Sequence, residues 1–99
     1  MTLAQSFQSE AIARAQTAML TYGCPTKRLV ETLQAKGGVE TARELCRRGR
    51  LSDGFDALQK CGHLELSLEA LVIQGKYGTL FTDEEVNGCL DALMAAGYF

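Results

Sequence analysis

The sequence contains no tryptophan, one proline and one histidine in 99 residues. A single histidine leaves little from which to build a nucleophile with its general base, and no G-x-S-x-G, G-x-G-x-x-G or P-loop motif occurs. The adjacent carboxylates Glu84 and Glu85 suit the first turn of a helix better than they suit a catalytic pair. We therefore predict a protein that is not an enzyme and that uses no cofactor.

Long apolar runs are also missing. No stretch approaches the roughly 20 apolar residues that a membrane-spanning helix needs. Near the start of the sequence, Gln5, Glu10 and Arg14 interrupt the apolar segment that a secretory signal requires, and no basic segment precedes it. We therefore expect no membrane association and a cytoplasmic location, where thiols stay reduced.

The four cysteines, Cys24, Cys46, Cys61 and Cys89, include no C-x-x-C pair, which is the spacing that makes a zinc site recognisable. Three of them fall on apolar stripes, where a free cysteine behaves as a small hydrophobic residue. Cys24 precedes Pro25 in an expected turn, so it is predicted to be the most exposed thiol. We predict structural thiols in preference to disulfides.

Cys61-Gly62-His63 is the densest group of potential metal ligands. Cys46 and Cys89 would have to complete it from other helices, on which both are predicted to point inward. A helix end explains the same residues more simply, because Cys61 would pack, Gly62 would take a left-handed turn and His63 would be a polar loop residue. We predict no metal site.

The glycines stand mostly at the ends of apolar-periodic segments, as stops between helices. The expected helices are 4–22, a segment from Pro25 to Gly37, 39–48, a short helix between Ser52 and Gly62, 68–74, and a last helix from Thr82 to Gly97. The chain length suits one core. We predict a single domain over residues 1–99, an all-α compact bundle of five to six short helices.

Two helix starts carry specific signals. Thr82 and Glu85 form a capping box, and Phe81 and Val86 have the positions of a hydrophobic staple around it. Ser52 suits the N-cap of the short fourth helix, because two aspartates follow it in or near the first turn.

Residues 64–69 give two conflicting signals. Leucines alternate with polar residues there, which is typical of a half-buried strand, but no other segment alternates and offers a partner strand. Leu68, Leu71 and Val72 also fit helical spacing, and Ser67 is a suitable N-cap. We favour a helix.

The C-terminal half of the sequence resembles a group of small bacterial reading frames found in phage or mobile-element settings. Their tails read S-L/M-E-A-L-V, then an aromatic residue, then L-F-T-x-E-E and a final G-Y. The matching residues are Ser67 to Val72, Tyr77, Leu80 to Thr82, Glu84, Glu85, Gly97 and Tyr98. The resemblance implies a phage or mobile-element context and a small all-helical fold. It assigns no functional residue.

Charge is unevenly distributed although the net charge is only −2. The first fifty residues carry eight lysines and arginines against four glutamates, whereas the remaining residues carry two lysines against eight acidic residues. Arg43, Arg47 and Arg50 are spaced i, i+4 and i+7 and would share one helix face, with Arg48 beside them. Such a basic face would suit an acidic partner.

The same arginines also have a structural interpretation. Glu40–Arg43 and Glu44–Arg48 have the spacing of helical ion pairs, which would cancel part of the positive potential. A helix-turn-helix is a further alternative, since residues 49–52 would connect two helices. Its second helix, however, carries carboxylates that DNA phosphates would repel.

We predict a small non-enzymatic protein-interaction domain that binds a host or partner protein, as an accessory or inhibitor protein of a phage or mobile element would. The predicted contact residues are Arg43, Arg47, Arg48 and Arg50, with Tyr98 and Phe99 as an apolar contact. The alternative is a nucleic-acid-binding protein or small transcriptional regulator that uses the basic helix around Arg43 to Arg50. The oligomeric state is left open, because the alanine-rich first helix or the C-terminal aromatic residues would suit the interface of a homodimer.

Overall fold

The chain folds into six α-helices and two 3-10 helices over residues 2–98, which are the residues that the computed structural model describes. They are α1 (Leu3–Tyr22), α2 (Lys27–Lys36), α3 (Gly38–Arg48), α4 (Phe55–Cys61), η1 (Leu64–Leu66), α5 (Leu68–Val72), η2 (Gly75–Leu80) and α6 (Asp83–Ala95). No β-strand occurs among these residues, so the predicted all-α class is confirmed. None of the described helices is long and apolar enough to cross a membrane.

Most helix ends follow the local signals. The predicted capping box of α6 is present, with the Glu85 amide donating to the Thr82 hydroxyl at 3.2 Å and the Thr82 amide donating to the Glu85 carboxylate at 2.8 Å. Ser67 caps α5 by accepting from the Ala70 amide, and Leu68–Val72 are helical, as favoured over a strand, whereas the 3-10 helix at Leu64–Leu66 was not predicted. A second capping box, between Thr2 and Gln5 at the start of α1, was not predicted.

The prediction that Ser52 caps α4 is wrong. The N-cap is Gly54, whose φ of +85° lies in the left-handed region, and no side chain caps this helix. Ser52 is buried instead, and its hydroxyl donates a 2.5 Å hydrogen bond to the Glu69 carboxylate. A buried carboxylate takes the serine hydroxyl because leaving the carboxylate without a partner costs more than leaving a helix end open to water.

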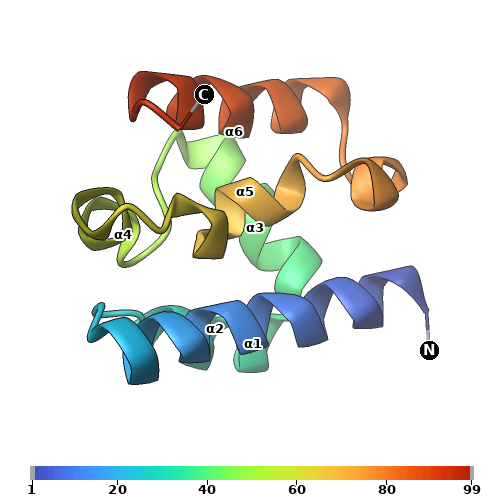
Figure 1. Ribbon diagram of the computed structural model, residues 1–99. Coiled ribbons are helices and arrows are strands. Elements are labelled where there is room, and N and C mark those ends of the chain that lie inside the picture. The colour runs from blue at the N-terminus through green and yellow to red at the C-terminus, as the bar shows by residue number, and fades with distance from the viewer. Residues whose placement is uncertain (1, 99) are drawn as a thin grey trace.

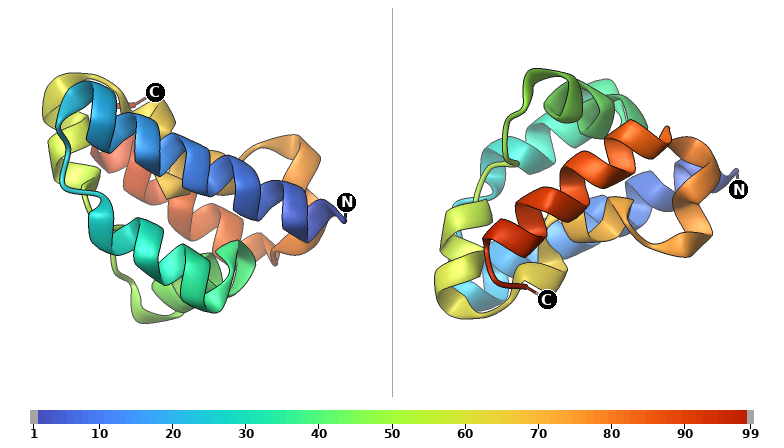
Figure 2. Two further views of the ribbon diagram at one scale, coloured as in Figure 1. Left: turned by 90° about the horizontal axis from the view of Figure 1, so that it is seen from below. Right: turned by 90° about the horizontal axis from the view of Figure 1, so that it is seen from above.

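The helices lie in two outer layers with α5 between them (Figure 1). Helices α1 and α2 form one layer, α6 lies on the opposite side, and α3 runs from the first layer towards α6. Figure 2 shows the same arrangement from both sides, with α1 and α2 in front in one view and α6 in front in the other. All five residues of α5 are buried, as a helix between two layers must be.

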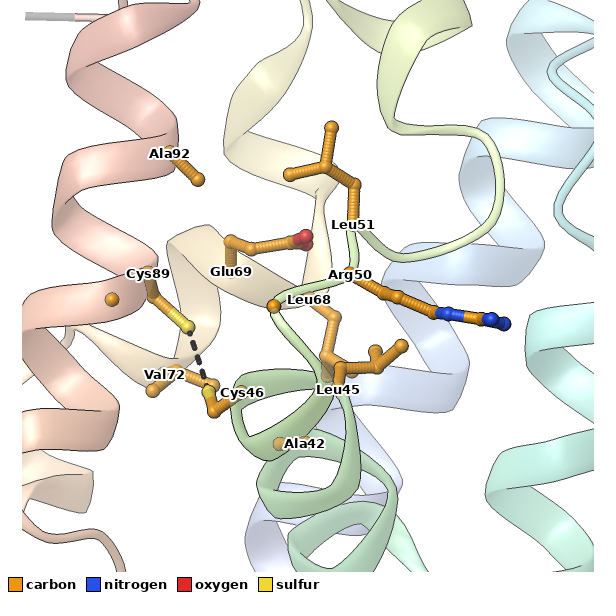
Figure 3. A pocket seen from close by; sticks show the side chains of 12 residues that line it. Ala42, Leu45, Cys46, Arg50, Leu51, Leu68, Glu69, Val72, Cys89 and Ala92 are labelled. Carbon is orange, nitrogen blue, oxygen red and sulfur yellow. Dashed lines mark hydrogen bonds between the residues drawn. The ribbon is translucent and has the colours of Figure 1, made fainter.

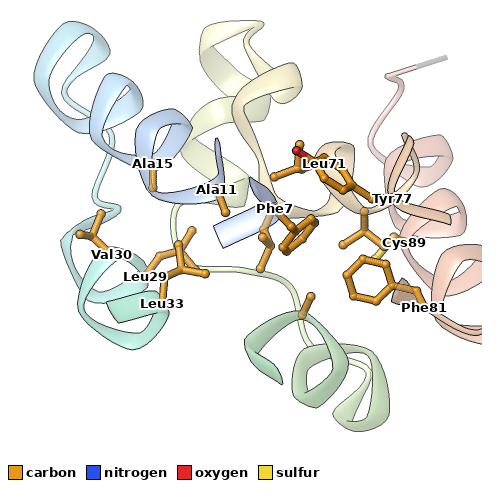
Figure 4. Packing of buried hydrophobic residues seen from close by; sticks show 13 residues of the cluster. Phe7, Ala11, Ala15, Leu29, Val30, Leu33, Leu71, Tyr77, Phe81 and Cys89 are labelled. Atoms are coloured by element: carbon orange, nitrogen blue, oxygen red, sulfur yellow. The ribbon is translucent and has the colours of Figure 1, made fainter. Parts of the chain in front are cut away.

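The larger hydrophobic cluster is centred on Phe7 of α1 (Figure 4). The Phe7 ring lies edge-on to Tyr77 and to Phe81, with ring centroids 5.1 Å apart in both cases. On its other side α3 comes very close, because a Cβ atom added to Gly38 would lie 2.9 Å from Phe7 Cδ1. This end of the core is therefore close-packed.

A second cluster lies where the C-terminal ends of α1 and α6 meet α4. Its members are Ala18, Cys24, Phe55, Leu58, Leu64, Ala70 and Leu93. Cys24 is only 3% exposed, so the prediction that it is the most exposed thiol is wrong. Cys61, expected to pack inward, is the exposed cysteine, because it occupies the last position of α4.

Candidate functional site

A half-enclosed apolar pocket of about 110 Å³ lies between α3, α5 and α6. It is lined mainly by small and aliphatic side chains of these helices and by the segment that follows α3. The lining residues are Ala42, Leu45, Cys46, Gly49, Arg50, Leu51, Leu68, Glu69, Val72, Gly88, Cys89 and Ala92. Figure 3 shows that a carboxyl group and two thiols among them come from three different helices. Convergent polar groups in an apolar hollow are typical of a binding site.

Glu69 supplies the carboxyl group and is 5% exposed. Its two oxygens accept from Ser52, one from the backbone amide at 2.8 Å and the other from the hydroxyl at 2.5 Å. Burial raises the pKa of Glu69, and the hydrogen bonds from Ser52 offset that effect only in part. The carboxyl group thus fixes the segment after α3 against α5 and forms part of the pocket wall.

Cys46 of α3 and Cys89 of α6 supply the two thiols, whose Sγ atoms are 3.5 Å apart. Cys89 is buried, whereas Cys46 is half-buried and also donates to the Glu85 carbonyl oxygen at 3.5 Å. The hydrogen bond between the thiols lowers the pKa of Cys46 and raises that of Cys89, and burial adds to the increase at Cys89. Cys46 is therefore the thiol that ionises first.

The candidate ligands Cys61 and His63 do not meet this thiol pair. The His63 ring stacks on Tyr22 with centroids 3.9 Å apart, and its Nδ1 lies 3.0 Å from the Glu65 carboxylate. Cys61 lies close enough to buried Cys24 to contribute, after burial, to the raised pKa of that thiol. Within residues 2–98, no three His, Cys, Asp or Glu side chains are grouped closely enough to hold a metal ion.

Three of the predicted contact arginines are in ion pairs. Arg47 pairs with Glu40 at 2.9 Å and Arg48 with Glu44 at 3.1 Å. Arg43 was expected to pair with Glu40 but turns to the neighbouring helices, where its Nη2 donates to the Leu80 carbonyl at 2.6 Å and its Nε lies 3.8 Å from Glu85. The basic face is thus partly neutralised within the fold.

Arg50 differs from the other three arginines. It is exposed, and its guanidinium makes no ion pair with any residue in the described part of the chain. It lines the pocket, and in Figure 3 its side chain extends away from the two thiols. Leu51, next in the chain, is 46% exposed. A free cation and an exposed aliphatic side chain therefore lie together at the pocket.

The predicted C-terminal contact lies elsewhere. Tyr98 is 37% exposed, and its amide donates to the Leu93 carbonyl at the end of α6. That end is tied to α4, since the Gln59 side chain donates to the Ala96 carbonyl. Figure 2 shows the end of α6 and the end of α3 on different sides of the molecule. Phe99 lies outside the described residues.

Glu69 and the cysteine pair were not predicted as a site. The partners Ser52 and Glu69 are 17 residues apart in sequence, and the two thiols are 43 residues apart. One signal did exist for Glu69, since it is the only charged residue within the largely apolar segment 66–73. A short helix that is apolar on every side is buried, and a charge on it must find a buried partner.

The fold and the site define a small all-α domain with a half-enclosed apolar pocket that contains a carboxyl group and a thiol pair. Comparisons with protein-family models, with curated proteins and with solved structures found no match to this chain. The function is therefore argued from the geometry of the pocket.

Proposed function

We propose that this protein is a small, non-enzymatic interaction domain that binds an acidic segment of a partner protein at the α3–α5–α6 pocket. An aliphatic side chain of the partner enters the pocket, and a neighbouring carboxylate pairs with Arg50. The observation that carries the proposal is the position of an unpaired, exposed guanidinium beside an apolar pocket. The accessory or inhibitor role in a phage or mobile element is a finer proposal and depends on the sequence resemblance alone.

The size of the pocket favours one side chain over a small-molecule ligand. Sites for drug-sized ligands have volumes of about 300–1,000 Å³, whereas this pocket has about 110 Å³. A cavity of roughly 150 Å³ holds one benzene molecule, so an isopropyl or isobutyl group is a suitable occupant. The exposed Leu51 extends the apolar contact at the pocket.

The charge near the pocket favours an acidic partner. Helix α3 ends with Arg47 and Arg48, and Arg50 follows. Glu40 pairs with Arg47, Glu44 pairs with Arg48 and also with Lys36, and Arg50 keeps a positive charge without an ion pair among the described residues. Glu69 is the acidic residue in the pocket wall, and its carboxylate is engaged by Ser52. Charge complementarity of this kind selects the partner and increases its association rate.

A selection from a library of random peptides tests the proposal. We expect the enriched peptides to combine an aliphatic residue with Asp or Glu, and we expect Arg50→Glu to abolish their binding. Arg28→Glu is the matched control, because Arg28 is an exposed arginine on α2, outside the pocket lining. Leu51→Ala should weaken binding, whereas Leu20→Ala, at an exposed position on α1, should not.

Three results would overturn the proposal. If the enriched peptides lacked acidic residues, or if no peptide were enriched, the proposed acidic partner would be wrong. Equal loss of binding in Arg50→Glu and Arg28→Glu would show a general charge effect. Tight binding of duplex DNA that weakens steeply with salt would support the alternative, a nucleic-acid-binding protein, because release of counterions from phosphates gives that dependence.

A further inference from the structure

Cys46 and Cys89 are placed to react with each other. They belong to helices α3 and α6, and their sulfur atoms are 3.5 Å apart across the wall of the pocket. A disulfide bond is about 2.0 Å long, so the sulfurs must approach by about 1.5 Å. The adjoining pocket and the small neighbours Gly88 and Ala92 leave space for both side chains to turn.

We propose that Cys46 and Cys89 form a redox-modification site, in which a small hydroperoxide oxidises the two thiols to a disulfide that joins α3 to α6. The inference is independent of the partner proposed above. It depends on the 3.5 Å distance between the two sulfur atoms.

The two thiols have different environments, and these assign their roles. Cys46 is half-buried at the pocket, so a small peroxide reaches it, and the hydrogen bond from Cys89 stabilises its thiolate. Cys89 is buried and holds its proton more tightly. Cys46 is therefore the attacking thiol and Cys89 the resolving thiol.

The reaction balances with hydrogen peroxide as the oxidant. The Cys46 thiolate attacks one peroxide oxygen, the O–O bond breaks, and a sulfenic acid forms while the other oxygen leaves as hydroxide and takes up a proton to become water. The Cys89 sulfur then attacks the Cys46 sulfur, and the S–OH oxygen leaves as a second water with the Cys89 proton. Two thiols lose two electrons in total, and the peroxide gains them.

The second cysteine pair provides an internal control. Cys24 and Cys61 also lie near each other, but Cys24 is 3% exposed and its pKa is raised, first by burial and then by the neighbouring Cys61. Cys24 therefore lacks the lowered pKa that makes Cys46 the attacking thiol. We expect this pair to stay reduced at a peroxide concentration that oxidises Cys46 and Cys89.

Peptide mapping of the full chain tests the proposal. The reduced protein is treated with hydrogen peroxide, alkylated and digested with trypsin under non-reducing conditions. The four cysteines then lie on four different peptides, namely 15–27, 44–47, 61–76 and 77–99. We expect peptides 44–47 and 77–99 to be recovered as one cross-linked species that dithiothreitol separates, and peptides 15–27 and 61–76 to be recovered alkylated.

Two outcomes of this map would overturn the inference. In one, all four cysteines are alkylated as completely as in the untreated protein. In the other, a disulfide joins 15–27 to 61–76 while the remaining two peptides stay alkylated. The wild-type map is decisive even if a cysteine variant should fold poorly.

Variants test the roles of the two thiols. In Cys89→Ser the reaction should stop at the sulfenic acid, so dimedone should label Cys46, and absence of that label would contradict its role as the attacking thiol. In Cys46→Ser, Cys89 should remain a thiol. The control Cys24→Ser/Cys61→Ser should form the Cys46–Cys89 cross-link to the same extent as the wild-type protein, and loss of the cross-link there would also overturn the proposal.

Discussion

The two ends of α3 are packed in opposite ways. At its start, Gly38 lies so close to α1 that an added Cβ would be 2.9 Å from Phe7 Cδ1. Near its end, Cys46 and Gly49 border a pocket of about 110 Å³ against α5 and α6. The same helix thus contributes a close-packed end and an open end, where the chain has room for a ligand or a reaction.

Two glutamates on neighbouring helices, Glu10 on α1 and Glu69 on α5, have opposite pKa shifts. Glu10, near the close-packed end, is bonded to Tyr77, Lys76 and Arg14. Although partial burial opposes ionisation, the hydrogen bonds and charges of these neighbours lower the pKa of Glu10. Glu69, at the open end, accepts hydrogen bonds from Ser52, and burial raises its pKa. The pKa shifts differ in sign because Lys76 and Arg14 lie beside Glu10, whereas no cation lowers the pKa of Glu69.

The largest expected effect is at the close-packed end. Phe7 is completely buried, and Phe7→Ala should cost about 3–5 kcal/mol in the free energy of unfolding, because it leaves a cavity between α1, α3 and η2. Leu45→Ala, at the half-buried wall of the open end, should cost less. Urea unfolding of both variants measures the difference, and equal losses would show that the two ends are packed alike.

Two helical glycines test the same contrast with one added methyl group. Gly38→Ala should destabilise the fold by about 1–3 kcal/mol through overpacking, since the added atom would meet Phe7 and the Gln8 backbone. Gly88→Ala should stabilise it by about 0.8–1.0 kcal/mol, the difference in helix propensity, because nothing lies within 4 Å of the added atom. Thermal unfolding gives both signs, and a stabilising Gly38→Ala would contradict the close approach.

The pH dependence of stability separates the two glutamates. The folded state favours protonated Glu69, so its contribution to stability is complete below the ordinary pKa of 4.5 and is lost as pH rises through the raised folded value. Glu69→Gln should remove this loss, so the stability of the variant relative to wild type should increase as pH rises above about 4.5. Denaturant unfolding at a series of pH values measures it.

Glu10→Gln is the control and should have the opposite sign. The lowered pKa of Glu10 means that its contribution is present above the ordinary carboxyl pKa and is lost as pH falls through the lowered folded value. The variant should therefore approach wild-type stability on acidification. The same pH slope in both variants would contradict the assignment of opposite environments.

The smallest expected effect is on the hydrogen bond that joins Glu10 to the core. Tyr77→Phe removes a hydroxyl that donates to the Glu10 carboxylate at 2.8 Å and leaves the buried ring in place against Phe7. We expect a loss of about 0.5–1.5 kcal/mol, because water can still solvate the half-buried carboxylate. Urea unfolding measures the loss, and a loss as large as that of Phe7→Ala would show that the hydroxyl matters more than the ring.

Local signals predicted the fold better than the site. The capping box at Thr82 and the N-cap at Ser67 were correct because both depend on atoms three residues apart. Ser52 carries the same type of signal and was misassigned, since the buried Glu69 competes for its hydroxyl from 17 residues away. Arg43 likewise does not pair with Glu40 as expected. It lies near Glu85 on α6 and donates to the Leu80 carbonyl.

The sequence alone determined that the chain is all-helical and where most helices begin and end, because hydrophobic periodicity and caps act over a few residues. Only the tertiary structure decided which of the four predicted contact arginines stays unpaired, which glutamate is buried and which cysteines meet. Those outcomes depend on the approach of α3, α5 and α6, which brings together groups up to 43 residues apart in sequence. The close packing of α1 on Gly38 holds one end of α3, and the small residues on α6 leave its other end open.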